Sequence, residues 1–395
     1  MKIIQINVVY GKGSTGKIVF DLHNYYLHQN HNSLVLFARG NNGYPNTNVR
    51  KIMPEFLFKI QSFFSKLTGY SYAGNFLSTS LVIIKILFFK PDIVHLHSIN
   101  GSTLNFYRIL HFLKSFGIKT VITAHAEFVY TAGCSYTLGC EKWKNGCGNC
   151  PQYNKTRPFS FFFDKSDKEI NLLKKAYKNF SKLILVSVSE WVMENYRQFP
   201  ELISNTHKVI NNGLNTNVFK LLNYNSKPIL DTKFKYLLHV TSNFEDPIKG
   251  GNYILALSRL LPNNYKIVVV GNSKTYDYPN IIFLGKIYDQ DKLAQLYNEA
   301  NLTIIVSKKE TYSMICAESL CCGTPVVGFL AGGPESISIK KYSEFVQYGN
   351  LNALYEAIIR LSSATFDRIE ISNEASITYS IKRMADEYLE VYKNN

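Results

Sequence analysis

The segment that decides the fold reads LTIIVSKKETYSMICAESLCCGTPVVGF and runs from Leu302 to Phe329. It begins and ends with short apolar runs, residues 302–306 and 325–329, which are typical of buried strands. A helix-like stretch lies between them and ends at the turn Gly323-Thr324-Pro325. Strand, helix and strand in this order predict two parallel strands joined by a helical crossover.

The same alternation extends over nearly the whole chain. Apolar strands separated by helices predict parallel sheets covered on both faces, so we expect an α/β fold. Two runs of strands indicate two doubly wound, Rossmann-like domains. The expected strands are 3–9, 34–37, 93–96, 119–123 and 183–188, then 236–241, 267–271, 281–284, 302–306, 325–329 and 345–348. The helical stretches between them include 17–28, 104–116 and 168–180, then 251–261, 292–300 and 351–361.

The chain of 395 residues is too long for one ordinary core and suits two domains. The strand and helix patterns lapse into Asn-rich, turn-forming sequence between Pro200 and Lys233. We therefore expect an N-terminal Rossmann-like domain over 1–205 and a C-terminal Rossmann-like domain over 206–375. A final helix within 376–395 could pack back on either domain, and the N-terminal domain is one candidate. Since ligands bind at the carboxyl ends of strands in such domains, two facing domains would enclose a cleft.

Composition limits the class of protein. Hydrophobic residues make up 46% and charged residues 18%, which is typical of a globular chain. The formal charge of +15 favours an anionic partner, and nucleic acid, anionic lipid and phosphorylated small molecules all fit it. The N-terminus alternates apolar and polar residues and predicts a first strand instead of a secretory signal. The longest apolar run, Leu81–Phe89, is far shorter than a bilayer span, so we expect a cytoplasmic protein.

Two carboxylates stand near the start of the helix in the opening segment. Glu310 lies in the loop before it, and Glu318 lies further into it. The backbone N–H groups of Thr311, Tyr312, Ser313 and Met314 are expected at the helix start, which suits a diphosphate. Glu310 would reach a sugar, and Glu318 would accept two hydrogen bonds from a ribose diol. Taken alone, Glu310 and Glu318 would be two acids near a helix start, where negative charge is generally favourable.

The stretch from Ile281 to Glu335 resembles the donor-binding half of glycosyltransferase family four. That family has two glutamates separated by seven residues, then a Gly-Thr-Pro turn and a Gly-Gly loop, here Gly332-Gly333. The resemblance implies a GT-B fold, a UDP- or GDP-sugar as substrate, retention of anomeric configuration and no catalytic metal. It also implies that Glu310 contacts the transferred sugar and that Glu318 contacts the ribose. Some relatives that assemble polysaccharides (O-antigen, capsule or exopolysaccharide) carry a similar cysteine-rich insertion.

Lys249, in the sequence Pro247-Ile-Lys-Gly250, follows an expected strand. It resembles the lysine of the family that grips the donor diphosphate, where a compact cation meets phosphate. An alternative is a solvated lysine at a helix start. The family usually has an arginine a few residues earlier, whereas residues 241–246 contain none.

The sequence Gly11-Lys-Gly13-Ser-Thr-Gly16-Lys17 follows the first expected strand and opens a helix. It nearly matches the phosphate loop of nucleoside triphosphatases, but Ile18 replaces the hydroxyl residue that would hold Mg²⁺. An NTPase or kinase therefore remains an alternative with one mismatch. The loop also resembles the first strand–helix turn of family four, which implies donor-binding roles for Gly13 and Gly16.

Three histidines stand at the ends of neighbouring strands. His95 and His97 belong to one, and His125 ends the next. Together they have the composition of a metal site, but strand-end histidines also bind sugar hydroxyls. His125 matches the active-site histidine of the family, although Ala126 replaces the aspartate that often follows. We expect His125 to be catalytic and His95 to be a packed strand residue.

Four cysteines crowd into the insertion at 133–151, namely Cys134, Cys140, Cys147 and Cys150. A closing C-x-x-C suits an all-thiolate structural zinc site, which would brace a loop with little core of its own. A redox pair and ordinary thiols or disulfides are the alternatives.

Aromatic residues and lysines occur together at helical spacing over 56–67. Residues 81–90 again combine apolar residues with lysines. Such a surface suits an anionic membrane that carries a lipid-linked glycan acceptor. A core helix with a basic outer face is equally compatible. Nucleic acid is not expected, because no recognition motif accompanies the charge. The resemblance to family four implies that the protein is a glycosyltransferase; the alternatives are a glycan phosphorylase of the same architecture, a P-loop NTPase and a non-catalytic binding protein.

Overall fold

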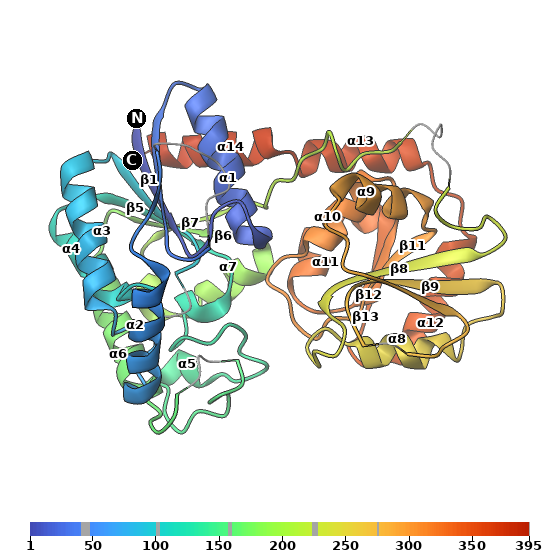
Figure 1. Cartoon of the computed structure of the whole chain (residues 1–395), viewed down its shortest axis with the longest axis horizontal. Helices are drawn as coiled ribbons and strands as arrows, with labels where there is room; N and C mark the ends of the chain where they lie inside the picture. Colours follow the sequence, from blue (N-terminus) through green and yellow to red (C-terminus); the bar gives the residue numbers. More distant parts are fainter. Residues whose placement is uncertain (41–47, 100–102, 157–159, 223–227, 275, 395) are drawn as a thin grey trace. The chain divides into compact units, whose positions relative to one another are not determined.

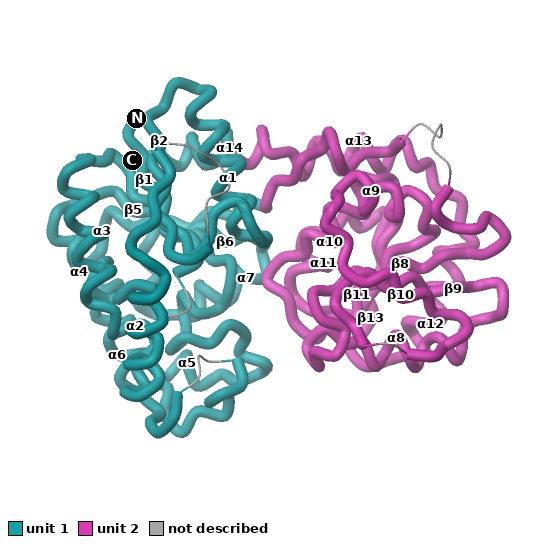
Figure 2. The backbone as a smooth tube through the Cα atoms, in the orientation of Figure 1, with its two compact units in different colours: residues 1–211, 385–395 teal, residues 212–384 magenta. Residues whose placement is uncertain are grey.

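The computed structural model describes residues 1–40, 48–99, 103–156, 160–222, 228–274 and 276–394. The chain forms two compact units (Figures 1 and 2). Unit 1 contains residues 1–211 and 385–395, and unit 2 contains residues 212–384.

Unit 1 is built on a seven-stranded sheet in the order β3-β2-β1-β4-β5-β6-β7. Its paired strands are all parallel. Apolar and β-branched side chains dominate the central strands, which are buried as expected for a sheet covered on both faces. The strands are β1 (Lys2–Asn7), β2 (Asn32–Phe37), β3 (Val49–Lys51), β4 (Ile93–Leu96), β5 (Lys119–Ala124), β6 (Leu183–Ser187) and β7 (Thr206–Val209).

The helices of unit 1 connect these strands and flank the sheet (Figure 1). They are α1 (Gly13–His28), α2 (Glu55–Thr68), α3 (Phe76–Phe89), α4 (Phe106–Ser115), α5 (Lys142–Asn145), α6 (Ser166–Tyr177) and α7 (Glu190–Tyr196). Two short 3-10 helices, η1 (Glu127–Val129) and η2 (Pro200–Leu202), complete the unit.

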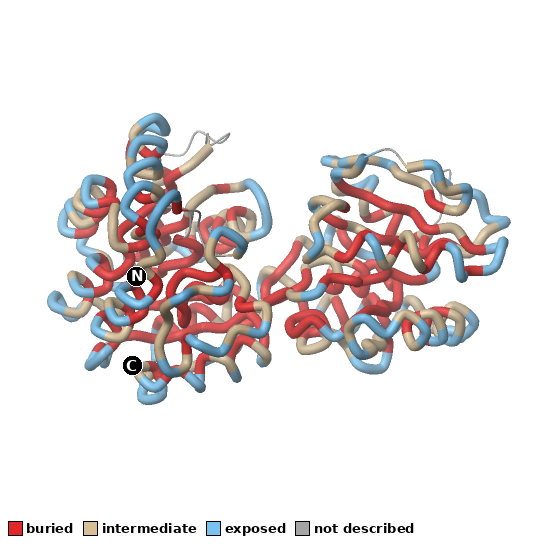
Figure 3. Tube along the Cα trace, turned by 90° about the horizontal axis from the view of Figure 1, so that it is seen from below, coloured by how far each residue is buried: buried red, intermediate tan, exposed pale blue. Residues whose placement is uncertain are grey.

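Unit 2 has a six-stranded parallel sheet in the order β10-β9-β8-β11-β12-β13. Its apolar core gathers buried Leu, Ile and Val side chains from the strands and from α8 and α12. Figure 3 colours the buried stretches of the chain red. The strands are β8 (Lys235–Asn243), β9 (Tyr265–Asn272), β10 (Ile281–Gly285), β11 (Leu302–Ile305), β12 (Val326–Phe329) and β13 (Ser343–Val346). The helices are α8 (Gly251–Ser258), α9 (Gln290–Glu299), α10 (Met314–Cys321), α11 (Gly333–Ile337), η3 (Lys340–Tyr342), α12 (Leu351–Ser363) and α13 (Arg368–Thr378). The last helix, α14 (Ile381–Lys393), begins in unit 2 and ends in unit 1.

Both sheets confirm the predicted doubly wound α/β fold. In each sheet the strand order reverses beside the first strand, at β1 in unit 1 and at β8 in unit 2. Ligands of such sheets bind outside the carboxyl ends of the strands at this reversal. The topology thus directs attention to the loops after β1 and β4, and to those after β8 and β11.

Two edge strands, β3 and β7, were not expected from the sequence. β3 has three residues, and β7 has an alternating burial pattern instead of a continuous apolar run. β7 pairs with β6 and extends the first sheet, so unit 1 continues to Asn211 and not to residue 205. Short or half-exposed edge strands carry a weak sequence signal, because neighbouring strands supply much of their stability.

The end of α14 belongs to unit 1, with residues 385–395. The Tyr26 hydroxyl donates to that of Tyr392 at 3.3 Å, and the Tyr392 hydroxyl lies 2.5 Å from Nδ1 of His95. The Tyr388 hydroxyl lies 2.8 Å from that of Thr123 on β5. Because these groups are buried, their hydrogen bonds to one another offset the cost of removing them from water.

Tyr392→Phe is expected to destabilise unit 1 by about 1–3 kcal/mol, since it leaves His95 and Tyr26 with a lost buried partner. Thermal or urea unfolding measures the change. Tyr288→Phe is the matched control, because Tyr288 is 87% exposed. Equal destabilisation by the two substitutions would contradict the role given to the Tyr392 hydroxyl.

Candidate active site

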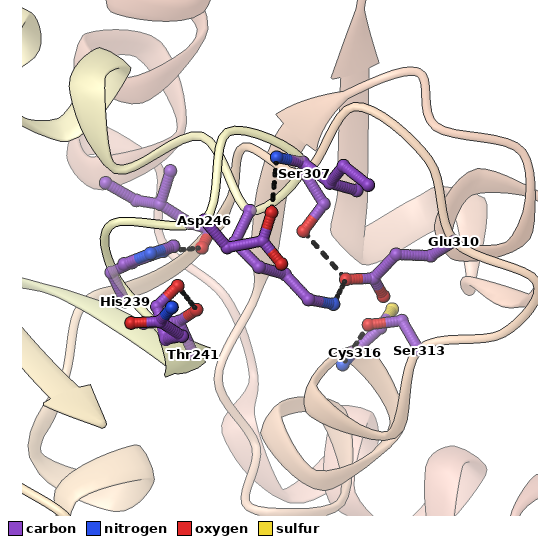
Figure 4. Close-up of polar contacts among 11 residues, drawn as sticks. His239, Thr241, Asp246, Ser307, Glu310, Ser313 and Cys316 are labelled. Atoms are coloured by element: carbon purple, nitrogen blue, oxygen red, sulfur yellow. Dashed lines mark hydrogen bonds and ion pairs between the residues drawn. The ribbon is translucent and has the colours of Figure 1, made fainter. Parts of the chain in front are cut away.

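An ion pair joins the ends of two neighbouring strands in unit 2. Nζ of Lys249, after β8, lies 3.0 Å from Oε1 of Glu310, after β11. The hydroxyl of Ser307 donates to the same oxygen at 2.7 Å, as Figure 4 shows. β8 and β11 pair side by side, so the two loops meet at the sheet edge. The structure thus brings together two residues that are 61 positions apart in the sequence.

Backbone geometry fixes the lysine. The Lys308 N–H donates to the carbonyl of Ile248 at 2.7 Å, which ties the two loops together. Gly250 has φ +76°, and a Cβ atom there would lie 2.2 Å from the carbonyl oxygen of Val306. Only glycine allows this close approach. The sequence Lys249-Gly250 therefore places the cation against β11.

The backbone of Glu310 is held by the glycine-rich loop that follows β12. Its N–H donates to the carbonyl of Ala331 at 3.0 Å, and its carbonyl accepts from the Gly333 N–H at 2.8 Å. The Glu335 carboxylate accepts from the Ala331 and Gly332 N–H groups at 3.0 and 2.6 Å. Glu310 is only 7% exposed, and these contacts fix its backbone in the loop.

The start of α10 follows directly. Ser313 is the N-cap, and its side chain accepts from the Cys316 N–H, so the helix begins at Met314 within the expected range. Thr311 and Tyr312 are buried, and the Tyr312 hydroxyl donates to the carbonyl of Asn212 at 3.0 Å. The side chain of Tyr312 is therefore structural, whereas the backbone of residues 311–314 remains the predicted diphosphate site.

Glu318 has a partner of its own. The Tyr297 hydroxyl donates to its Oε2 at 3.0 Å, and burial raises the pKa of Tyr297, so the hydroxyl keeps its proton. Sequence reasoning missed Tyr297 and also Ser307, the partner of Glu310. The spacing of Ser307 three residues before Glu310 was a usable signal. Tyr297 lies on α9 and gave none.

In unit 1, the glycine loop connects β1 to α1. Gly13 starts α1 with φ +64°, and Gly16 sits in its first turn. A Cβ atom on Gly16 would lie 3.0 Å from Cγ2 of Val9, so the helix start packs closely on the loop. The structure places both glycines where the resemblance expects them, and their contact with a donor remains a prediction.

The three histidines form a row beside the loop. Nδ1 of His97 lies 3.3 Å from Nε2 of His125, and Nε2 of His97 lies 3.2 Å from Oε1 of Gln5. His95 is fully buried against Thr123 and Tyr392, so it is a packed strand residue as expected. Burial lowers the pKa of His125 to about 4 and that of His97 well below its usual value. Both rings are therefore neutral at physiological pH.

The four cysteines of the insertion line one small cavity of about 20 Å³, together with Trp143. Gly146 and Gly148 have positive φ, which lets the chain turn tightly around it. Among the residues described, no three His, Cys, Asp or Glu side chains are gathered as a metal ion requires. A zinc ion would have to draw the thiols of Cys134, Cys140, Cys147 and Cys150 together, and the zinc site stays a prediction.

The part of the chain that carries this geometry is similar to known proteins. Residues 235–364, which contain Lys249, Glu310 and Glu318, match the family model described as "Glycosyl transferases group 1". A curated relative, the putative colanic acid biosynthesis glycosyl transferase WcaC of Escherichia coli, is 23% identical over the full length of both chains. Residues 235–364 thus form a group 1 glycosyl transferase domain, and the chain is a glycosyltransferase.

Solved structures show the same fold for this glycosyltransferase. HepE of Anabaena, solved in complex with UDP, superposes with a TM-score of 0.66 at 14% identity, covering 100% of both chains. Sucrose-phosphate synthase of Thermosynechococcus elongatus gives a TM-score of 0.67 at 16% identity, covering 99% of this chain and 98% of the other. At such identities the likeness concerns the fold alone.

Stability should depend on pH through His125. Its folded pKa of about 4 lies below the ordinary value of 6.5, so the unfolded state binds the proton more readily. The stability it confers is complete above pH 6.5 and is lost as pH falls towards 4, by about 2 kcal/mol at pH 5. Unfolding of His125→Gln between pH 7 and 5 should show a smaller loss than wild type. If the free energy of unfolding fell equally with pH in wild type and in the variant, the low pKa assigned to His125 would be contradicted.

The zinc prediction is tested by metal analysis of the purified enzyme. We expect about one zinc per chain from a four-thiolate site, and loss of that zinc in Cys147→Ser. Cys322→Ser is the matched control, because Cys322 is buried in unit 2. Protein without stoichiometric metal would exclude the site.

Proposed function

We propose that this glycosyltransferase moves a sugar from a nucleotide-diphosphate donor to a hydroxyl of a lipid-linked glycan, in the assembly of a surface polysaccharide. The observation that carries the proposal is the Lys249–Glu310 pair at the reversal point of the second sheet. The likeness to WcaC supports a polysaccharide product, and the UDP and UDP-glucose complexes of HepE support a uridine or related donor. The inner face of the cell membrane is the place where such an acceptor would meet a cytoplasmic donor.

The pair suits a donor that is anionic at one end and rich in hydroxyls at the other. A lysine ammonium has three N–H donors, so Lys249 can keep its bond to Glu310 and still donate to a diphosphate. The backbone N–H groups at residues 311–314 and the dipole of α10 add positive potential on the same side. Together they would stabilise the departing nucleoside diphosphate, and activity should survive EDTA.

The two glutamates would then divide the donor between them. Glu310, fixed by Ser307 and Lys249, accepts hydrogen bonds from hydroxyls of the transferred sugar. Glu318, positioned by Tyr297, accepts from the ribose diol. In unit 1 the neutral His125 would hydrogen-bond the sugar near the reacting carbon, and Gly13 and Gly16 would let the backbone approach the ligand. Retention of configuration follows from the family resemblance.

Glu310→Gln should lower kcat about 100-fold, because a fixed electrostatic partner of the reacting sugar is lost. Glu318→Gln should instead raise the KM for the donor about tenfold, since a charge-assisted hydrogen bond to the unreacting ribose is weakened. Release of nucleoside diphosphate from a panel of UDP- and GDP-sugars measures both. Glu356→Gln is the control, because Glu356 is exposed on α12.

Other results would favour the alternatives. Turnover that requires inorganic phosphate would indicate a phosphorylase. ATP hydrolysis that is lost in Lys17→Ala but kept in Glu310→Gln would indicate an NTPase. Full transfer by Glu310→Gln would refute the role given to that carboxylate.

A further inference from the structure

Helix α2 presents its apolar side to solvent. Phe56, Ile60, Phe63 and Phe64 are 61, 48, 54 and 56% exposed, and they recur at helical spacing along one stripe. On its other side α2 buries Phe58 and Ser65, and the Ser65 hydroxyl donates to the carbonyl of Tyr70. Surface helices of water-soluble domains normally keep most of their apolar side chains on the core side. The exposed stripe therefore calls for an apolar environment outside the domain.

The neighbouring helix α3 buries Val82 and Ile86, but it also exposes apolar side chains. Its first residues, Phe76 and Leu77, are 60 and 50% exposed, while Ser78 and Thr79 are fully buried. The hydroxyl of Ser78 donates to Oε1 of Gln61 on α2 at 3.2 Å, so the two helices lie side by side.

The segment Phe161–Phe163 extends the apolar stripe of α2. The Phe161 N–H donates to the carbonyl of Lys66 at 2.9 Å, and the Phe161 and Phe63 ring centroids are 6.2 Å apart. Phe162 is 69% exposed and Phe163 is 49% exposed. We call the surface made by α2, the start of α3 and residues 161–163 the aromatic face.

The charges around the aromatic face are mainly basic. Residues 55–90 contain four lysines and one glutamate, and that glutamate, Glu55, is paired with Lys51 at 3.1 Å. Nζ of Lys165 lies 4.9 Å from the ring centroid of Phe163, and the guanidinium of Arg108 lies 5.6 Å from that of Phe76. Long basic side chains lying along aromatic rings place their charges at the rim of the apolar surface.

A cavity of about 520 Å³ opens within the aromatic face, with Phe64, Phe76 and Leu77 in its wall. Asn75 also lines it and is only 6% exposed. Neither Oδ1 nor Nδ2 of Asn75 has a hydrogen-bond partner among the residues that the structure describes. Since buried amides are nearly always paired, Asn75 points to a polar group supplied from outside.

We propose that the aromatic face docks unit 1 on an anionic lipid bilayer, with part of one lipid entering the cavity beside Asn75. Phenylalanine, isoleucine and leucine enter the acyl boundary, and the lysines meet anionic head groups. A protein partner fits less well, because lysine is depleted in protein interfaces. No helix in the described parts of the chain is long and apolar enough to cross the membrane, so the contact lies in the interface plane. Membrane docking is inferred independently of the proposed function. Only its benefit, which is to bring the enzyme to a lipid-linked acceptor, rests on that function.

Cosedimentation of the full chain with vesicles tests the proposal. We expect binding to vesicles of phosphatidylglycerol and phosphatidylcholine, and much weaker binding to phosphatidylcholine alone. Phe63→Ser combined with Phe162→Ser should lower the partition coefficient about tenfold or more. Lys59→Gln combined with Lys66→Gln should lower it roughly fivefold per lysine on the anionic vesicles only.

Matched controls come from unit 2, where Ile377 is 76% exposed and Lys292 is also exposed. Ile377→Ser and Lys292→Gln should bind vesicles like wild type. Equal sedimentation of wild type and the aromatic double variant would overturn the proposal. So would a wild-type dimer that the same variant converts to a monomer, because the aromatic face would then be a self-interface.

The thermal shift caused by UDP- and GDP-sugars separates this proposal from the proposed function. The aromatic variants should keep the shift of wild type, which also shows that they fold. If wild type binds vesicles but no UDP- or GDP-sugar raises its melting temperature, the membrane proposal holds and the proposed nucleotide-sugar donor is refuted. If a nucleotide sugar raises the melting temperature but vesicles do not bind, the donor is supported and the membrane proposal is refuted.

Discussion

The ion pair between Lys249 and Glu310 is the contact on which the donor half depends. Each residue follows a buried parallel strand, and the 3.0 Å distance exists because β8 and β11 are neighbours in the sheet. Removing one partner of a mostly buried pair leaves the other charge uncompensated, which is strongly destabilising. The Ser307 hydroxyl bonds to the Glu310 carboxylate, and Ala331 and Gly333 bond to the Glu310 backbone, so a residue whose position the proposed chemistry requires is held at both ends.

In unit 1 the buried polar groups of the candidate site are neutral histidines instead of an ion pair. Its histidines lie in a buried row in which each ring has a neutral partner, and desolvation lowers their pKa values. A neutral imidazole can hydrogen-bond a sugar hydroxyl without repelling a cationic transition state. Farther along the same unit, α2 and α3 expose several phenylalanines, although each helix also buries apolar residues such as Phe58 and Val82. Both features make unit 1 suited to a sugar acceptor held at a lipid surface.

The sequence predicted the fold class and most of the central strands, because continuous apolar runs and helical periodicity are local signals. The short edge strands β3 and β7 were missed, since they depend on the neighbours they pair with. The sequence also did not decide which side of α2 faces outward. Its alternation of aromatics and lysines fits either a core helix or an exposed one, and only packing against α3 shows which side is outward.

The sequence by itself determined that Glu310, Glu318 and Lys249 are candidate donor contacts, since the Gly-Thr-Pro turn and the Gly-Gly loop accompany them. It also grouped four cysteines whose thiols line one cavity. Only the tertiary structure decided that Lys249 meets Glu310, that Tyr297 holds Glu318 and that Asn75 lacks a partner among the described residues. The physical reason is that a helix or strand pattern is set by neighbours along the chain. An ion pair or a hydrogen bond at a sheet edge is set by which strands pair, and strand pairing links residues far apart in sequence.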